Sequence, residues 1–463
     1  MIADWIADWI CGFTIEQAGR AAIEKTKDHL IDFIGVLLAG AAEEESARTA
    51  FEYVSRMGGR KDSTLFERGG GRLPSESVAF AHASAAHSIE MDDVHNASSL
   101  HPAVAVIPAA LAVAEEFQRS GGELIEAMIA GYEVILRIGE AANPSAIYAR
   151  NFHPTAVCGV FSSAAAAGKL MKLTPEQMTN ALGLAWSFAS GNMSFQTEGS
   201  WAKRLQIGNT ARAGVQAARL ALLGATGPKQ VFSDTGFFQG YSGEFHSEKM
   251  TDGLGERLKI LETGIKPYAC CRYNQAPVDG LLELRRADKI SADNIERIEI
   301  EIASTGLPLV AIPAEEKRTP SNSVAAQFSL YYSSAVAVVA GAAGREEYRD
   351  PWLNDTRVLQ LAQRVNTGSS QEIDAIFPKK WATRIRIQTK SGERIDHFAT
   401  DCLGDPEKPM SRGQIVEKFC SLASGSLSEV GRSNLVEQIV GLETLSEASA
   451  LARTIVHGFG PSI

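Results

Sequence analysis

Histidine is the side chain best suited to moving protons near neutral pH, and this chain concentrates it in one stretch. Nine histidines occur in 463 residues, and five of them lie between positions 82 and 153. The segment that begins at His87 also carries Asp92 and Asp93, and His101 follows a polar stretch. Titratable groups this dense, between two apolar runs, indicate a loop that presents them at a cleft. The alternative is a solvated loop with helix caps.

A second candidate is His153, which precedes Pro154 and an Ala-rich run. Proline favours the first position of a helix, so His153 is expected at the amino-terminal edge of one. The helix dipole there favours the neutral imidazole, which can act as a base. A polar helix cap without a catalytic role is the alternative interpretation.

Two basic patches stand out in a chain with a net charge of -10. Lys203 and Arg204 form the first, and the second contains Lys266, Tyr268 and Arg272. Lysine and arginine supply charge and directed donors for carboxylates. The second patch lies where the helical pattern gives way to an α/β pattern, which indicates a domain junction. Domain junctions often hold ligand clefts. Surface cations near turns are the alternative for either patch.

Several classes of function are excluded by the sequence. It has no Walker A loop, no strand followed by G-x-G-x-x-G and no G-x-S-x-G elbow. The six cysteines make no C-x-x-C pair, and His95 and His101 lack a metal-ligand spacing. The acidic balance argues against nucleic acid, and no run of about twenty apolar residues predicts a membrane span. The acidic start, with Asp4 and Asp8, is unlike a signal peptide, so a cytoplasmic protein is expected. Because the cofactor and metal motifs are missing, no metal or organic cofactor is expected.

The first 265 residues have a helical pattern, so helices are expected to position the candidate side chains there. Thr14 with Gln17 reads as a capping box that opens a helix through Leu38, with Gly40 as its end. Thr174 before Pro175 marks another helix start. The apolar runs of helical length are Val78–Ser88, Ala103–Phe117, Leu124–Ala141 and Ala156–Leu170.

The pattern changes after Gly264 and changes back after Ser411. Isoleucines alternate with charged residues from Ile298 to Ile302, again in Arg384–Lys390, and a short run follows through Phe398, all typical of strands. Helices are expected over Val324–Ala343 and Asp355–Val365, and again from Ser411 to Ala452. The prediction is a mainly α fold, with an all-helical domain from 1–265 and 401–463 and an α/β domain over 266–400.

The ordered set of motifs resembles the MmgE/PrpD family, which includes 2-methylcitrate dehydratase, cis-aconitate decarboxylase and iminodisuccinate epimerase. The motifs are His87-Ser-Ile-Glu-Met-Asp-Asp93, His101-Pro102, His153-Pro154-Thr155, Trp201-Ala-Lys203-Arg204, Lys266-Pro-Tyr268 and Gln327-Phe-Ser-Leu330. The resemblance implies a helical domain built from both chain ends, a smaller α/β lid and a homodimer. It also implies an active site between domain and lid that needs no metal or organic cofactor.

The resemblance further implies the site residues. The catalytic set would be Asp93, His101, His153, Lys203, Lys266 and Tyr268, with Arg204, Arg272 and Tyr332 binding substrate. The two lysines would hold carboxylates and stabilise enolate-like charge. His153 or His101 would remove an α-proton, and the other histidine, with Asp93 or Tyr268, would assist the leaving group or return a proton.

The chain departs from the family pattern at a few polar positions. Gln206-Ile207 stands where many members have His-Pro, and Asn274-Gln275 stands where Thr-His is common. Ala103 replaces the glycine that usually follows His-Pro. Two positions that could touch substrate therefore lack an imidazole.

The first interpretation is a cofactor-independent lyase that acts on a small di- or tricarboxylate, most simply a 2-methylcitrate-type dehydratase. An epimerase of an iminodisuccinate-like dicarboxylate and a cis-aconitate-type decarboxylase are the rivals within the family. All three pass through carbanion-like charge beside a carboxylate. A non-catalytic helical binding protein is the rival outside it, and it predicts no turnover that depends on His101 or His153.

Overall fold

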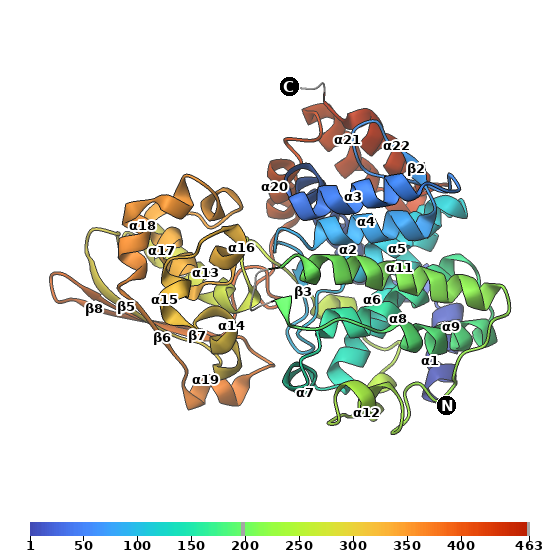
Figure 1. Ribbon diagram of the computed structural model, residues 1–463, viewed down its shortest axis with the longest axis horizontal. Coiled ribbons are helices and arrows are strands. Elements are labelled where there is room, and N and C mark those ends of the chain that lie inside the picture. Colours follow the sequence, from blue (N-terminus) through green and yellow to red (C-terminus); the bar gives the residue numbers. More distant parts are fainter. Residues whose placement is uncertain (196–199, 461–463) are drawn as a thin grey trace. The chain divides into compact units, whose positions relative to one another are not determined.

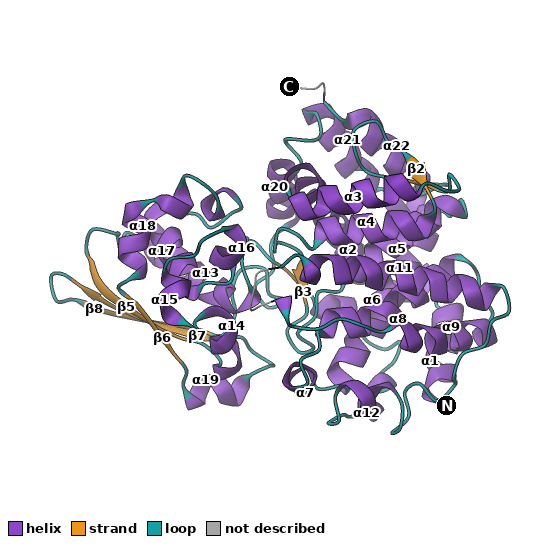
Figure 2. Cartoon of the chain, viewed as in Figure 1, coloured by secondary structure: helices purple, strands orange, loops and turns teal. Residues whose placement is uncertain are grey.

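The computed structural model describes residues 1–195 and 200–460. The chain divides into two compact units. Unit 1 is Met1–Thr263 with Ser411–Ile463, and unit 2 is Gly264–Met410. The structure is 59% helical with 8% strand, which confirms the prediction of a mainly α fold (Figure 2).

Unit 1 is a bundle of helices drawn from both sides of unit 2 in the sequence (Figure 1). Its longer helices are α1 (Ile2–Gly12), α2 (Ile15–Glu43), α3 (Glu45–Met57), α4 (Ser75–Ala86), α5 (Ala103–Glu116), α6 (Gly121–Ala141), α8 (Pro154–Leu170), α9 (Pro175–Phe188), α11 (Ala202–Leu222), α20 (Arg412–Leu422), α21 (Glu429–Val440) and α22 (Ser449–Gly458). Short helices are α7 (Pro144–Ala149), α12 (Phe237–Tyr241), η1 (Ser247–Met250), η2 (Lys259–Glu262) and η6 (Leu442–Thr444).

Small residues let the central helices of unit 1 approach closely. Helix α8 packs against α5, α6, α9 and α11, and nearly all of its side chains are buried. A Cβ added at Gly159 of α8 would lie 2.9 Å from atoms of Ala105 and Thr210. One added at Gly214 of α11 would lie 2.3 Å from the Cβ of Ser163. The neighbouring helix ends are therefore held at fixed positions, since such packing leaves no room for adjustment.

The predicted helix starts are confirmed, and one predicted end is wrong. Thr14, Thr174 and Ser411 each form a capping box at the start of a helix. Helix α2 does not stop at Gly40 but continues to Glu43, and it is kinked at Gly19, whose φ of 69° is not helical, so the predicted single helix is interrupted after its first turn. A Cβ at Gly40 would lie 2.1 Å from the carbonyl oxygen of Ala85, so this glycine serves close packing against α4 rather than chain reversal.

Unit 2 is built on a four-stranded sheet of order β6-β5-β7-β8. Its strands are β5 (Ile295–Glu301), β6 (Val365–Gly368), β7 (Thr383–Thr389) and β8 (Arg394–Ala399). Ile298 pairs with Ile387 and Ile300 with Ile385, and all four side chains are buried. Helices α13 (Arg272–Arg286) and α17 (Leu330–Ala340) contact this sheet (Figure 1). The structure thus confirms the strands β5, β7 and β8 that the period-2 alternation predicted.

Two predicted helices of unit 2 differ from the structure. The helix expected over Val324–Ala343 is two helices, α16 (Ser323–Gln327) and α17, because the Ser329 side chain caps a new start by accepting from the Tyr332 amide. The helix expected through Val365 ends early as α18 (Thr356–Ala362). Its last residues turn into β6, which pairs with β5 in parallel.

The remaining elements are short. In unit 2 they are β4 (Gly264–Ile265), η3 (Ser304–Gly306), α14 (Leu307–Val310), α15 (Ala314–Arg318), η4 (Glu346–Tyr348), η5 (Trp352–Asn354) and α19 (Gln371–Ile376). In unit 1 they are the two-residue strands β1 (Ser63–Thr64), β2 (Arg72–Leu73) and β3 (Asp93–Val94). Before residue 260, the described chain contains no sheet of three strands, as the sequence predicted. No described helix has the length and apolarity to cross a membrane.

Candidate active site

The candidate residues of unit 1 lie at the ends of helices that pack together. His87 follows α4, His101 precedes α5, His153 is the N-cap of α8, and Lys203 lies in the first turn of α11. Helix α11 contacts the other three, and α5 contacts α4 and α8. Residues separated by more than a hundred positions are therefore brought together by the small-residue packing of the bundle.

Three of these side chains form what we call the histidine group: His87, His101 and His153. The ring centroids of His87 and His101 are 5.5 Å apart, and those of His87 and His153 are 5.9 Å apart. His87 is fully buried, whereas the His101 side chain keeps 15% exposure. Within this group, His101 is the ring most open to solvent or a ligand.

Backbone geometry fixes the neutral tautomer of His101. Its Nδ1 lies 2.6 Å from the carbonyl oxygen of Asp93, and a carbonyl can only accept, so Nδ1 carries the proton. Nε2 of the neutral ring is then the atom that can take up a proton. His101 can act as a base when neutral and as an acid once protonated.

Asp92 is the carboxylate that serves the histidine group. Its Oδ2 lies 2.7 Å from Nδ1 of His87 and 3.5 Å from Nδ1 of His101. Burial and the charge of Lys203 lower the pKa of His87, against the opposing effect of Asp92. His87 is therefore neutral at pH 7 and donates its Nδ1 proton to Asp92. Its Nε2 finds no hydrogen-bond partner in the described structure.

Gln206 fixes His153 in the opposite tautomer. The Gln206 amide oxygen accepts from the Asn192 backbone N–H at 3.1 Å, and its nitrogen donates to the Asn192 carbonyl at 3.2 Å. This backbone pairing sets the amide orientation, so the same nitrogen donates to Nδ1 of His153 at 2.8 Å. His153 consequently carries its proton on Nε2. Burial, with the nearby His87 and Lys203, lowers its pKa well below the usual value, so it is a neutral donor.

Lys203 is nearly buried and forms an ion pair with Glu90. Glu90 has φ of 57°, a left-handed conformation that is costly for a residue with a side chain and is concentrated at functional sites. The neighbouring Arg204 points elsewhere, because its guanidinium contacts Glu44 and Ser46 at the start of α3. The structure thus places the ammonium group, but not the guanidinium, as the cation whose charge acts on the histidine group.

The Asp93 carboxylate is directed into the core of unit 1. Oδ1 accepts from the Ala103 amide at 2.9 Å and Oδ2 accepts from the Tyr132 hydroxyl at 2.8 Å. His29 Nδ1 lies 3.4 Å from Oδ2. Burial, reinforced by the charge of Asp92, raises the pKa of Asp93 to about 8. Of the two adjacent aspartates, Asp92 contacts the histidine group through its side chain and Asp93 does so through its backbone.

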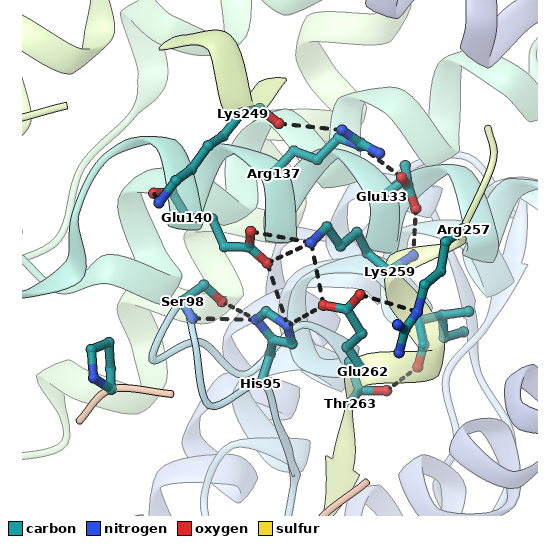
Figure 3. Close-up of polar contacts among 12 residues, drawn as sticks. His95, Ser98, Glu133, Arg137, Glu140, Lys249, Arg257, Lys259, Glu262 and Thr263 are labelled. Carbon is teal, nitrogen blue, oxygen red and sulfur yellow. Dashed lines mark hydrogen bonds and ion pairs between the residues drawn. The ribbon is translucent and has the colours of Figure 1, made fainter. Parts of the chain in front are cut away.

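The loop that carries His101 is anchored by a network around His95 (Figure 3). His95 is buried; its Nδ1 accepts from the Ser98 amide at 3.3 Å, so its Nε2–H points at Glu140 and Glu262, each 3.7 Å away. Lys259 Nζ donates to Glu140 at 2.9 and 3.1 Å and to Glu262 at 3.2 Å. The contact with His95 lowers the pKa of Glu262 to about 2.

The same network contains one group of side chains with the composition of a metal site. Ligand atoms of His95, Glu140 and Glu262 all lie within 4.8 Å of one another. Lys259 already bridges the two carboxylates and offsets part of their charge (Figure 3). A lysine in that position fits an ion-pair network that holds the loop, and it would have to leave before a cation could bind.

In unit 2, Lys266 and Tyr268 are both buried. The Tyr268 hydroxyl donates to Asp279 at 2.6 Å, and burial raises the tyrosine pKa well above its usual value. Gln275 donates to the carbonyls of Tyr268 and Cys270 at 2.9 and 3.0 Å. The Gln275 amide therefore ties down the turn that carries Tyr268.

The other two predicted substrate ligands have partners within unit 2. Arg272 donates to Asp405 at 2.7 Å and stacks on Trp381 at 5.1 Å. The Tyr332 hydroxyl donates to the Glu347 carbonyl at 2.8 Å. These contacts hold both side chains inside the fold of unit 2.

Sequence reasoning left three residues of this arrangement out of the candidate set: His87, Asp92 and Gln206. His87 and Asp92 lie inside a motif that was recognised, but their mutual contact depends on the turn between them. Gln206 was visible only as a departure from the family pattern. Its spacing from Lys203, three residues along α11, is the signal that places both on one helical face.

Neutral histidines, a carboxylate and a lysine gathered at the helix ends of one unit are the arrangement of an acid–base enzyme. The chain belongs to the MmgE/PrpD family: the family's N-terminal domain matches residues 4–249 and its C-terminal domain matches residues 268–442. Cis-aconitate decarboxylase from Aspergillus terreus is 31% identical over 82% of this chain and 81% of its own length. The proteins of the same name from Homo sapiens and Mus musculus are 27% and 25% identical, over 99% and 100% of this chain and 95% and 94% of theirs.

Proposed function

We propose that this protein is a decarboxylase that acts on cis-aconitate or a closely similar unsaturated tricarboxylate. The relatives named cis-aconitate decarboxylase support it, as does the proton chemistry of the histidine group. These relatives do not single out the 2-methylcitrate-type dehydratase that the motifs suggested first.

The reaction has simple chemical requirements. The carboxylate on the saturated CH₂ leaves as CO₂, and its bonding electron pair forms a new C=C bond to the central carbon. The original double bond shifts its electrons to the vinyl carbon, which takes up one proton. The product is a dicarboxylate with a terminal methylene group. The enzyme must therefore supply a proton donor and positive charge for the carboxylates that stay, whose charge grows as electrons move.

His101 is proposed as the proton donor, and its geometry is the observation that carries the proposal. Its Nδ1 is held by the Asp93 carbonyl at 2.6 Å, so the proton taken up by Nε2 is the one that can be delivered to carbon. Asp92 Oδ2, 3.5 Å from the same ring, stabilises the imidazolium before transfer. After transfer the neutral ring returns to the tautomer set by the Asp93 carbonyl.

Other residues are proposed to bind the substrate. His153, fixed as a neutral Nε2–H donor by Gln206, would hydrogen-bond a carboxylate without giving up its proton. Lys203 would exchange part of its contact with Glu90 for a substrate carboxylate. Lys266 and Tyr268 are proposed as further carboxylate ligands on the strength of the family motif and their side-chain chemistry. The proposal includes a homodimer, which light scattering checks, and a cytoplasmic location, which cell fractionation checks.

Proton NMR in heavy water tests the proposal directly. With cis-aconitate, a decarboxylase gives CO₂ and a product that carries one deuterium on the new saturated carbon. A dehydratase would instead convert 2-methylcitrate or citrate into an alkene without loss of carbon. An epimerase would exchange the α-proton of iminodisuccinate and release nothing. Turnover of either alternative substrate without CO₂ release from cis-aconitate would overturn the assignment, and binding without any turnover would support a non-catalytic protein.

A further inference from the structure

His29 of α2 has its protonation pattern fixed by Thr263. The Thr263 hydroxyl lies 2.5 Å from the Ile260 carbonyl and 2.6 Å from Nε2 of His29. A hydroxyl has one proton, and the carbonyl can only accept. Thr263 therefore donates to Ile260 and accepts from His29, so Nε2 of His29 carries a proton.

The other nitrogen of His29 faces the Asp93 carboxyl group. Nδ1 lies 3.4 Å from Asp93 Oδ2, and both side chains are fully buried. If His29 is neutral and Asp93 is ionised, Nδ1 and Oδ2 face each other in the core with lone pairs on both atoms and no proton between them. Such an arrangement is costly where no water can intervene. One proton between the two atoms removes the conflict.

We infer that Asp93 and His29 share one buried proton, and that Asp93 works in its protonated form as a positioning residue for His101. Asp93 holds the His101 loop at two points, since its carbonyl accepts from His101 Nδ1 and its Oδ1 accepts from the Ala103 amide. A protonated side chain donates to His29 and still accepts from Ala103. The reacting histidine is thus located by a neutral acid rather than by a second anion.

The surrounding charges favour the proton on Asp93 rather than on His29. On α2, Lys25 lowers the pKa of His29, and Lys418 of α20 does the same, although burial is the larger cause. Asp92 and Asp32 both raise the pKa of Asp93. Asp32 is itself paired with Lys418 at 2.6 Å. The Tyr132 hydroxyl from α6 contacts the same Asp93 oxygen at 2.8 Å, which completes the shell without adding a charge.

Asparagine is the matched replacement, because a neutral amide reproduces a protonated carboxyl group. In Asp93→Asn the oxygen accepts from Ala103, and the nitrogen donates to His29 and to the Tyr132 hydroxyl. Asp92→Asn is the control one position away, where the same change removes the charge that serves His87 and His101. We expect Asp93→Asn to lower kcat much less than either Asp93→Ala or Asp92→Asn, and to leave the acidic limb of the pH profile in place. Asp92→Asn should lower kcat by about 10² or more, the scale of lost acid–base catalysis.

Asp93→Ala completes the kinetic series, which rests on the proposed function. It leaves Ala103, Tyr132 and His29 without their partner, so kcat should fall, the acidic limb of the pH profile should move, and asparagine should restore both. An Asp93→Asn enzyme that folds but is as impaired as Asp92→Asn would overturn the inference.

Two measurements need no activity, so they separate this inference from the proposed function. Infrared spectra of the wild type should contain a buried carboxylic acid band that moves with ¹³C-labelled aspartate, is missing in Asp93→Asn and shifts in Tyr132→Phe. If Asp93→Asn fails to fold, the labelled wild type and Tyr132→Phe still decide the matter. The free energy of unfolding should also contain an Asp93 contribution that falls as pH rises from 3.8 to about 8, the ordinary and folded pKa values of Asp93. The slope of the unfolding free energy against pH should therefore be more positive in Asp93→Asn than in wild type, and an unchanged slope together with no such band would refute the shared proton.

Discussion

His101 and His153 are both held at Nδ1, but by partners of opposite kind. A carbonyl holds Nδ1 of His101, and an amide N–H holds Nδ1 of His153. The first ring can gain and lose a proton at Nε2, whereas the second presents a fixed N–H. The motifs alone left open which histidine moves the proton, because tautomers are set by neighbours that approach from other segments. The residue types were predictable, but their protonation states were not.

The first residue-scale prediction concerns His101. His101→Ala should lower kcat by about 10² or more, because it removes the group that delivers the proton. His153→Ala should raise KM more than it lowers kcat, since a fixed donor binds the substrate without transferring its proton. Steady-state kinetics with cis-aconitate check both. Equal losses of kcat in the two variants, with melting temperatures unchanged, would contradict this division of roles.

The second residue-scale prediction concerns Lys203. Lys203→Met should raise KM and lower kcat together, with a loss in kcat/KM of roughly 2.7–4 kcal/mol, the scale of a missing oxyanion donor. Lys203→Arg should restore little, because a planar guanidinium does not replace a compact charge in a tight site. Arg204→Met is the matched control on the same helix turn, since Arg204 contacts α3. Normal kinetics in Lys203→Met would show that this lysine only neutralises Glu90.

Among the elements, helices and strands with a strong local signal could be predicted and those set by tertiary contacts could not. Capping boxes at Thr174 and Ser411 and the alternating isoleucines of β5 and β7 are local, and the structure confirms them. Strand β6 has four residues and no alternation, and it becomes a strand because it pairs with β5. Gly40 reads as a helix end, but its role depends on the carbonyl of Ala85.

The element-scale prediction tests the packing of α11 on α8. A Cβ at Gly214 would lie 2.3 Å from Ser163 Cβ and 2.7 Å from backbone atoms of Ala164 and Val160. Gly214→Ala should therefore lower the free energy of unfolding by about 1–3 kcal/mol. Activity should fall as well, because α11 carries Lys203. Gly240→Ala is the control, since nothing lies within 4 Å of its added Cβ; denaturant unfolding of both variants decides.

At the scale of the molecule, unit 1 holds several histidines that are neutral because they are buried. His82 is the clearest case, with a pKa lowered from 6.5 to about 3 by burial. Its Nε2 accepts from the Phe66 amide at 3.0 Å. Such a ring takes up a proton in the unfolded chain before it does so in the folded one. The stability that His82 contributes is therefore fully present above pH 6.5 and is lost as pH falls toward about 3.

The whole-molecule prediction follows from this loss of the His82 contribution at acidic pH. Between pH 6.5 and 3, His82 alone should contribute a slope in the free energy of unfolding of about 1.4 kcal/mol per pH unit. His82→Leu should be less stable than wild type at pH 7, because the Phe66 amide loses its acceptor. It should lose less stability on acidification. His246→Leu is the control, since that side chain is 60% exposed, and parallel acid unfolding curves for His82→Leu and wild type would refute the prediction.

The glycines between the helices of unit 1 bear on how enzymes of this kind diverge. A Cβ at Gly208 would lie 2.1 Å from Ser84 Oγ, and one at Gly159 or Gly214 would also lie within 3.0 Å of a neighbouring helix. Substitutions that add bulk along these contacts move whole helices and, with them, every side chain at their ends. Changes at single positions on the loops and first turns, such as a replacement of Gln206, leave the bundle in place. A new substrate preference is therefore expected to arise by exchange of one tethering side chain at a time, on a helical scaffold that stays in place.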